Sequence, residues 1–233
     1  MGRGWVHGIR EASSAKKGKL FTKIAKEISV AVRTGGSKDP NSNARLRLAL
    51  REAQKNSMPK DTVERAIKRG SGETQEGQLD EIVYEAYGAF GIPVLVEVLT
   101  DNKNRTVQDL RAIFVRGGGA LGEPGSVMWN FDHVCSVLAK DSKNRDAEEA
   151  AINVGANEVT SLEEGVFQFI GDKNDLDPIQ EGLSKEGWEV LKAEIIYKPK
   201  APAELKPDQE EMLEKLNENL NDHDDVKRVH FAL

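Results

Sequence analysis

Residues 14–36 read SAKKGKLFTKIAKEISVAVRTGG, and this stretch has the pattern of an amphipathic helix with one basic side. At 100° per residue, the apolar side chains, among them Leu20, Ile24 and Ile28, gather on one side. The opposite side carries Lys16, Lys19, Lys23 and Lys26, with Arg33 beside them. Ser14 suits the N-cap and the Gly35-Gly36 pair suits the stop. The stretch therefore predicts a helix that buries one side and presents a row of positive charge on the other.

Two further helices are predicted directly after it. One runs from about Asn43 to Asn56, and the other opens at Met58-Pro59-Lys60-Asp61 and ends at Gly70. On the first of these, Leu46, Leu50 and Ala53 share a face, while Arg47, Arg51 and Lys55 follow one another at i, i+4 and i+8 on another. Residues 1–73 thus predict a small helical head, preceded by a flexible arm over residues 1–13.

The charge of the chain is divided between this head and the rest. Residues 1–73 hold 17 Lys and Arg against 7 Asp and Glu, a net charge of +10, although the whole chain of 233 residues has a net charge of −6. Amphipathic surface helices are commonly lysine-rich, so a solvated face is the plain alternative. Two successive basic rows on an otherwise acidic chain instead favour contact with a polyanion.

Strand and helix patterns alternate after the linker of residues 70–78. Strands are predicted over Ile82–Tyr87, Pro93–Leu99 and Ser126–Phe131, with a helix over Thr106–Val115. From Val134 to Tyr197 the order is βαββαβ, which is the ferredoxin-like arrangement and is complete in itself. A final acidic helix and strand cannot fold alone, so we expect them to complete the earlier set of strands.

The predicted fold class is therefore α+β, with a three-helix N-terminal head and two α/β sandwich domains, one ferredoxin-like and inserted into the other. The expected ranges are 1–73 for the basic helical domain, 80–132 plus 207–233 for the discontinuous α/β domain, and 133–200 for the inserted domain.

The sequence indicates no catalytic or metal centre and no cofactor. Cys135 is the single cysteine, and the four histidines are scattered, so a protein-built zinc site is not expected. The run Gly117-Gly118-Gly119-Ala120-Leu121-Gly122 fits the dinucleotide-binding pattern, but a helix precedes it and a strand follows, which is the reverse of what that site needs. The run is read as a helix stop and a mobile loop. No apolar run has the length of a membrane span, and the expected localisation is cytoplasmic.

Candidate contacts with nucleic acid are the basic residues of the head and of one helix start. They are Lys16, Lys19, Lys23, Lys26, Arg33, Arg47, Arg51, Lys55, Lys60, Lys68, Arg69, Lys103 and Arg105. Two loops join them as expected contacts, namely Met58 with Pro59 and the triplet Gly117, Gly118 and Gly119. Basic rows alone would suffice for duplex DNA, whereas the loops suit an irregular surface such as folded RNA.

The sequence resembles the YebC family of probable transcriptional regulators along essentially its whole length. The matching segments include Lys19-Leu20-Phe21-Thr22-Lys23, Met58-Pro59-Lys60-Asp61, Thr100-Asp101-Asn102-Lys103-Asn104-Arg105-Thr106 and Asp222-His223-Asp224-Asp225-Val226. The chain departs from the family at its start, where Gly2-Arg3-Gly4-Trp5 replaces the usual Gly-His-Ser-Lys-Trp. The resemblance implies a helical head and two α/β domains.

The resemblance also implies function, in two versions. The family is described as DNA-binding transcriptional regulators and as ribosome-associated translation factors that relieve stalls at proline runs, with a mitochondrial relative that activates translation. We therefore expect a non-enzymatic, nucleic-acid-binding regulator of gene expression whose partner is DNA or ribosomal RNA in the ribosome, with no membrane and no small-molecule substrate. The alternative is a protein-interaction adaptor that docks a basic partner through its acidic C-terminal helix, without direct contact to nucleic acid.

Overall fold

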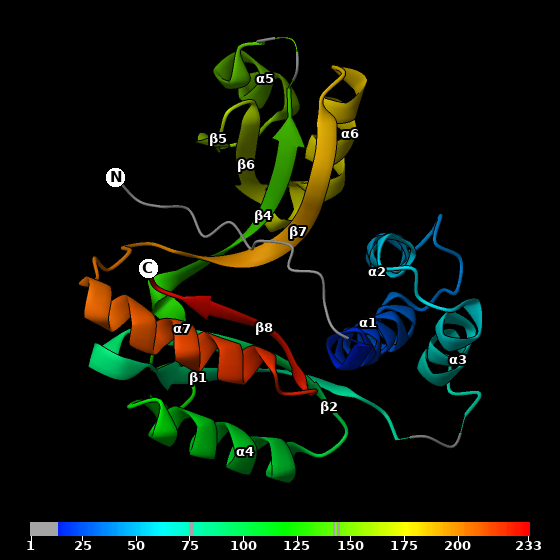
Figure 1. Ribbon diagram of the computed structural model, residues 1–233. Coiled ribbons are helices and arrows are strands. Elements are labelled where there is room, and N and C mark those ends of the chain that lie inside the picture. The colour runs from blue at the N-terminus through cyan, green and yellow to red at the C-terminus, as the bar shows by residue number, and fades with distance from the viewer. Residues whose placement is uncertain (1–13, 75–76, 142, 144) are drawn as a thin grey trace. The chain divides into compact units, whose positions relative to one another are not determined.

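The computed structural model describes residues 14–74, 77–141, 143 and 145–233, and the predicted arm over residues 1–13 lies outside them (Figure 1). Contacts group the chain into two units. We call residues 131–198 the inserted unit. The described residues of 14–130 and 199–233 form the host unit, which contains the helical head. The α+β class and its three-part organisation are confirmed, whereas the exact domain ranges stay a prediction.

The head consists of three helices, as the sequence predicted. They are α1 (Ser14–Gly35), α2 (Ala44–Lys55) and α3 (Lys60–Gly70). Asn43 caps α2 by accepting a hydrogen bond from the Leu46 amide, and its side-chain amide donates to Ala31 O of α1. The apolar sides of the three helices meet in one core that includes Ile28, Leu46 and Ala66. Burying those sides leaves the basic sides of the helices outside the head core.

A four-stranded sheet in the order β3-β1-β2-β8 forms the centre of the host unit. Its strands are β1 (Asp80–Tyr87), β2 (Pro93–Thr100), β3 (Ala120–Leu121) and β8 (Val226–Phe231), all paired antiparallel. The final strand pairs with β2, so the C-terminal helix and strand do complete the earlier set.

Helices α4 (Lys103–Arg116) and α7 (Pro207–Asn221) cover one face of this sheet (Figure 1). Phe114 of α4 and Leu213 of α7 share one core with Val94 and Val96 of β2. Alternation along the strand sends Leu99 to the opposite face, where it packs with Val30 of α1 and with Leu79. The head is therefore joined to the host sheet through a small apolar contact on the face away from α4 and α7.

The predicted strand Ser126–Phe131 is wrong. Residues Met128–Asn130 form a short 3₁₀ helix, and the strand β4 begins only at Phe131. The reason lies in the Glu85 carboxylate, which accepts hydrogen bonds from the backbone amides of Gly125, Val127 and Met128. Amides that bind a carboxylate cannot take part in a strand ladder, so this segment wraps around Glu85 instead.

The inserted unit contains a second four-stranded sheet, in the order β5-β6-β4-β7. Its elements are β4 (Phe131–Lys140), α5 (Ala147–Val154), β5 (Glu158–Glu163), β6 (Val166–Asp172), α6 (Leu176–Lys185) and β7 (Glu189–Pro199). This strand order is the ferredoxin-like one. Cys135 is buried in it, and burial raises the pKa of its thiol, which agrees with an unreactive structural cysteine.

Candidate nucleic-acid interface

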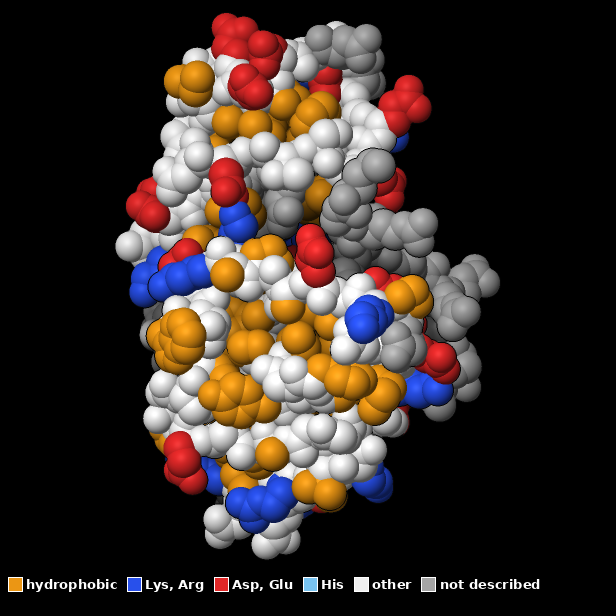
Figure 2. All heavy atoms as spheres, turned by 90° about the vertical axis from the view of Figure 1, so that its left-hand side faces the viewer, with side chains coloured by type: hydrophobic (Ala, Val, Ile, Leu, Met, Phe, Trp, Pro, Cys, Tyr) orange, Lys and Arg blue, Asp and Glu red, His pale blue; other side chains and the backbone are white. Residues whose placement is uncertain are grey.

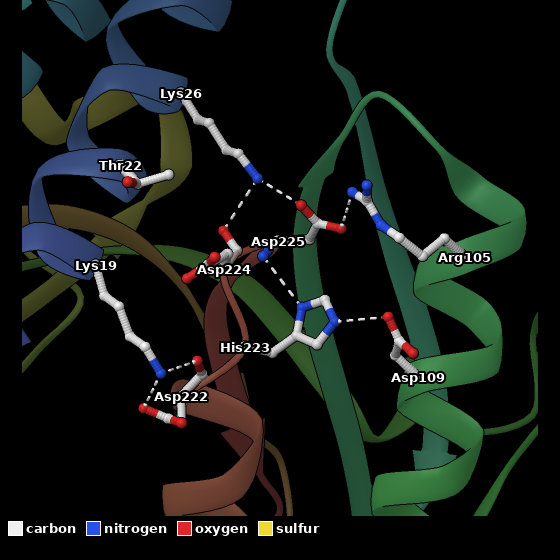
Figure 3. Close-up of a pocket in the computed structure, with 9 residues that line it drawn as sticks. All are labelled: Lys19, Thr22, Lys26, Arg105, Asp109, Asp222, His223, Asp224 and Asp225. Atoms are coloured by element: carbon white, nitrogen blue, oxygen red, sulfur yellow. Dashed lines mark hydrogen bonds and ion pairs between the residues drawn. The ribbon is translucent and has the colours of Figure 1, made fainter. Parts of the chain in front are cut away.

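The lysine row of α1 faces the turn that joins α7 to β8 (Figure 3). Lys19 Nζ lies 2.7 Å from Asp222 Oδ1, and Lys23 Nζ donates to the carbonyl oxygen of Asn221 at 2.5 Å. Lys26 Nζ donates to Asp225 Oδ1 at 2.5 Å and to Asp224 O at 3.1 Å. We call residues 221–225 the acidic turn. Three of the predicted phosphate contacts are thus engaged inside the chain.

Asp225 is the anchored acid of this turn. Its side chain is 2% exposed, and its Oδ2 accepts hydrogen bonds from Arg105 at 2.9 Å and from Thr106 at 2.8 Å. Burial alone would raise the pKa of Asp225, but the hydrogen bonds from Lys26, Arg105 and Thr106 outweigh burial and hold the pKa well below its usual range. The carboxylate is therefore ionised and joins α1, α4 and the start of β8.

The acidic turn has two exposed acids as well. Asp222 and Asp224 are exposed, whereas His223 is fixed between a hydrogen bond from the Asp225 amide to its Nδ1 and a 3.2 Å contact of its Nε2 with Asp109. Lysine and aspartate side chains of this region border an open hollow of about 490 Å³. Burial lowers the pKa of Lys23 to about 8, against the opposing effect of Asp224 and Asp222.

A second network of ion pairs joins the head to the host sheet. Arg45 of α2 contacts Glu27 of α1 at 2.7 Å and Glu81 of β1 at 2.7 Å. Lys227 lies 3.2 Å from the same Glu27 and 3.4 Å from Glu97. Both sheet and head therefore contribute charges to one partly buried cluster, and such clusters hold elements in register rather than leaving them free to move apart.

The exposed basic surface of the head lies on α2 and α3. Arg51, Lys55, Lys60 and Lys68 are exposed, and within the described part of the chain none of them has an ion-pair partner. Arg47 is half-buried and donates to Pro40 O at 3.3 Å, and Arg33 is half-buried on α1. We use the name α2–α3 basic surface for the four exposed residues.

The remaining predicted contacts are placed differently. Lys103 lies 3.2 Å from Asp80, and Arg105 binds Asp225, so both are paired within the host unit. Arg69 lies 3.7 Å from Asp101 and donates to Gly77 O at 3.1 Å. The side chain of Lys16 lies outside the described residues. The structure thus separates the predicted basic residues into an internally paired group and an open group.

Met58 and Pro59 belong to the turn that ends α2, and only Pro59 is exposed. Met58 is 8% exposed and belongs to the head core, whereas Pro59 is exposed. The Met58 amide donates to Ala53 O and the Ser57 amide to Gln54 O, which is the Schellman pattern at the end of α2. Ser57 adopts a left-handed conformation with φ of 55°. Pro59 and Lys60 are therefore presented to solvent on a fixed turn.

The glycine triplet packs against the host unit. A side chain at Gly117 would press on Leu216 of α7, and one at Gly119 would collide with the backbone oxygen of Tyr87. Close approach of two backbones explains the glycine at 119, and packing of α7 explains the one at 117. The expectation of a helix stop agrees with the end of α4 at Arg116.

The acidic turn was not among the candidate residues of the sequence, and no sequence pattern placed it opposite the α1 lysines. The available signal was its charge, since Asp222, Asp224 and Asp225 stand within four residues on a chain whose head is basic. Local patterns do not show which distant element a turn meets, and Lys19 and Asp222 are 203 residues apart.

In the part of the chain that the structure describes, no three His, Cys, Asp or Glu side chains are grouped so as to hold a metal ion. Among these same residues, no helix combines the length and apolar character needed to cross a membrane.

These features define a class, namely three-part α+β proteins in which a basic helical head precedes a discontinuous α/β unit with a ferredoxin-like insertion. Residues 5–73 match the model of the TACO1/YebC protein N-terminal domain, and residues 79–233 match that of the TACO1/YebC second and third domain. The chain belongs to the TACO1/YebC family.

Relatives with similar sequences carry a common name. A probable transcriptional regulatory protein of Bdellovibrio bacteriovorus is 44% identical over 234 residues and covers 100% of both chains. One of Pseudomonas fluorescens is 42% identical over 236 residues, with 100% of this chain and 99% of the relative covered. These names describe regulatory proteins rather than enzymes, in agreement with the expectation from the sequence.

A solved structure shares the fold. The crystal structure of a conserved hypothetical protein from Aquifex aeolicus superposes with a TM-score of 0.83 at 36% identity, covering 94% of this chain and 90% of that one. The agreement extends over nearly the whole chain, so it supports the three-part organisation as well as the single elements.

Proposed function

We propose that this protein regulates gene expression by binding nucleic acid, and that the α2–α3 basic surface makes the contact. The observation that carries the proposal is the division of the basic residues. Arg51, Lys55, Lys60 and Lys68 are exposed with no ion-pair partner among the described residues, whereas the α1 lysines are engaged by the acidic turn. Unpaired exposed cations are the groups that can neutralise phosphates without first losing an internal partner.

The relatives' names support a role in regulation. Their name as probable transcriptional regulatory proteins fits a nucleic-acid partner, and the net charge of the head gives such a partner a surface to approach. We propose no catalytic residue, cofactor or small-molecule substrate.

The salt dependence of binding tests this proposal. We expect the double variant Arg51→Gln/Lys55→Gln to bind more weakly at about 50 mM salt. Its log affinity should also fall less steeply with log salt, by about 1.8 in slope for a duplex, since each phosphate contact contributes about 0.9. The matched control is Lys173→Gln/Lys185→Gln, which removes two exposed positive charges from the inserted unit. Wild-type protein that binds neither DNA nor RNA at this salt concentration would contradict the proposal.

Folded ribosomal RNA is the form of nucleic acid that we propose, and duplex DNA is the second candidate. Pro59 stands exposed on a fixed turn beside Lys60, which suits a shaped surface better than a uniform duplex. Duplex DNA remains the candidate that the relatives' names favour. A translation role at proline runs belongs to the RNA version, because a factor of this kind would act on the ribosome.

The variant Pro59→Ala separates the two candidates because it changes no charge. Under the RNA version, we expect weaker binding to ribosomes and reduced translation of a reporter with a proline run. Under the DNA version, affinity for duplex and its salt slope stay at wild-type values, and so does translation of the reporter. Met58→Ala is unsuitable as a probe, because Met58 lies in the head core and its truncation would cost roughly 2–5 kcal/mol of stability.

The adaptor alternative rests on the outer side of α7. Glu210, Glu211, Glu214 and Glu218 are exposed there, and Glu211 pairs with Lys215 of the same helix. An amphipathic helix that covers a sheet exposes its polar side in any case, so this observation favours a solvated face. The double variant Glu210→Gln/Glu214→Gln would lose protein partners in a pull-down only if α7 is a docking surface.

A further inference from the structure

The acidic turn places carboxylates where a nucleic acid would place phosphates. Lys19, Lys23 and Lys26 form one row on α1, and each contacts a group of the turn between 2.5 and 2.7 Å. Asp222, which pairs with Lys19, has a side chain that is 67% exposed, and Lys19 itself is 42% exposed. Lys19 meets the exposed Asp222 carboxylate, Lys23 donates to the backbone oxygen of Asn221 and is within the field of Asp224 and Asp222, and Lys26 is held by the buried Asp225. Phosphate and carboxylate compete for the same ammonium groups, so the two exposed acids oppose a phosphate at Lys19 and Lys23.

The turn is held in place by contacts of its own. The Leu99 amide donates to Asp225 O at 2.8 Å, and His223 joins the turn to Asp109 of α4 at 3.2 Å. Asp225 is buried among its partners and belongs to the framework of the host unit. The two exposed acids, Asp222 and Asp224, therefore stand at fixed positions in front of the α1 row instead of moving away with a flexible loop (Figure 3).

We propose that Asp222 and Asp224 act as an intramolecular competitor that keeps nucleic acid off α1 and confines it to the α2–α3 basic surface. The inference rests on the function proposed above. The proposed function is that the head binds nucleic acid, and this inference adds that α1 is excluded from the binding surface. Lys19 and Lys23 become two further phosphate contacts when these two charges are removed, whereas Lys26 stays paired with Asp225.

The exposed position of both acids makes this test practicable. Surface ion pairs contribute little to stability, so replacing Asp222 and Asp224 leaves the fold in place, whereas replacing Asp225 would disturb it. The variant Asp222→Asn/Asp224→Asn in the full chain removes both charges and keeps side chains of the same size.

We expect the double variant to bind nucleic acid more tightly than wild type at about 50 mM salt, with a slope of log affinity against log salt that is steeper by about 1.8 for a duplex. Because two more contacts would be salt-sensitive, the gain in affinity should shrink roughly tenfold between 50 and 200 mM salt. A slope that equals the wild-type slope overturns the inference.

Two controls separate direct competition from a general change in net charge. The variant Glu210→Gln/Glu214→Gln removes two negative charges from the exposed side of α7, away from the α1 row, and should leave the slope unchanged. Adding Lys19→Gln and Lys23→Gln to the Asp222→Asn/Asp224→Asn variant should abolish the gain, whereas the same lysine changes in wild type should have little effect. A gain that survives the lysine changes would overturn the inference.

The outcomes also separate this inference from the function on which it rests. Wild type that binds, with a variant that shows no steeper slope, contradicts the competitor alone. Absence of binding by both proteins contradicts both proposals. If the double variant is unstable in thermal unfolding, Asp222→Asn alone is used, and half of the change in slope is then the expected result.

Discussion

Lys26 Nζ lies 2.5 Å from Asp225 Oδ1, and this pair joins the first helix of the head to the residue that directly precedes the last strand of the host sheet. Asp225 is nearly inaccessible, and Lys26 has a side chain that is 14% exposed. The pair is therefore unlike the Lys19–Asp222 pair, two turns earlier on α1, whose side chains are 42% and 67% exposed. The lysine row of α1 thus contains a buried ion pair, Lys26–Asp225, and an exposed ion pair, Lys19–Asp222.

Asp225→Asn should destabilise the host unit by about 3 kcal/mol, because it leaves the mostly buried Lys26 facing a neutral side chain. The measurement is the free energy of unfolding in urea. The matched control is Asp222→Asn, which should cost about 0.5 kcal/mol or less. Equal losses for the two variants would show that burial does not distinguish these pairs.

Acid should weaken the host unit through Glu97. Burial would raise the pKa of Glu97, but the hydrogen bond from His230 and the charge of Lys227 outweigh it and lower the pKa to about 2. The unfolded chain takes up this proton near pH 4.5, so the stabilisation is fully present above that pH and is lost as the pH falls toward 2. Urea unfolding between pH 6 and 3 should show the decline.

The variant Glu97→Gln tests the origin of this pH dependence. It should be less stable than wild type at pH 6, and its stability should change less between pH 4.5 and 3, because one proton-linked group has been removed. Glu27 and Glu81 also have lowered pKa values, so part of the decline persists. An unchanged pH profile would rule out Glu97 as a contributor.

Ser57→Gly should stabilise the head by about 0.5–1 kcal/mol. Ser57, which directly follows the C-cap Asn56 of α2, has φ of 55°, and a side chain is unfavourable in that conformation. Ser71 ends α3 with φ of −83°, so Ser71→Gly should bring no gain and serves as the control. Thermal unfolding of both variants checks the difference, and a loss of stability in Ser57→Gly would be evidence against strain at this turn.

Gly119→Ala should destabilise the host unit by about 1–3 kcal/mol, because the added methyl group meets the backbone oxygen of Tyr87, which cannot rotate away. Gly18→Ala is the opposite case. Gly18 lies in α1 with open space around it, so alanine should stabilise the helix by up to about 1 kcal/mol. Guanidinium unfolding compares the two, and a neutral Gly119→Ala would mean that the loop can move aside.

Local patterns were sufficient for most of the fold. The helix start near Asn43, the stop at Gly35-Gly36 and the helix end at Gly70 are signals carried by neighbouring residues, and the elements that they predict are present. The segment after Gly125 was predicted wrongly because its conformation depends on Glu85, which lies 40 residues earlier. Local strand propensity does not include hydrogen bonds to a carboxylate on a distant strand.

The sequence predicted which basic residues the head carries, but not which of them remain unpaired in the fold. The spacing of Arg47, Arg51 and Lys55 indicated a basic row on α2, and the same reasoning indicated one on α1. Which of the two rows stays open depends on a contact between residues about 200 positions apart, such as that of Lys26 with Asp225. The sequence therefore indicated how much positive charge the head carries but not how much of it is available.

The position of the acidic turn in the chain has a consequence for the protein during its synthesis. Lys19 is made 203 residues before Asp222, so the helical head is complete long before the carboxylates that cover α1 exist. After Gly70, the last residue of α3, about 150 residues remain to be made before Asp222, and at about 5–20 residues per second this takes roughly 8–30 seconds. Throughout that time a nascent chain has a fully cationic head beside the ribosome that makes it, and pairing with the acidic turn begins only when α7 and β8 emerge.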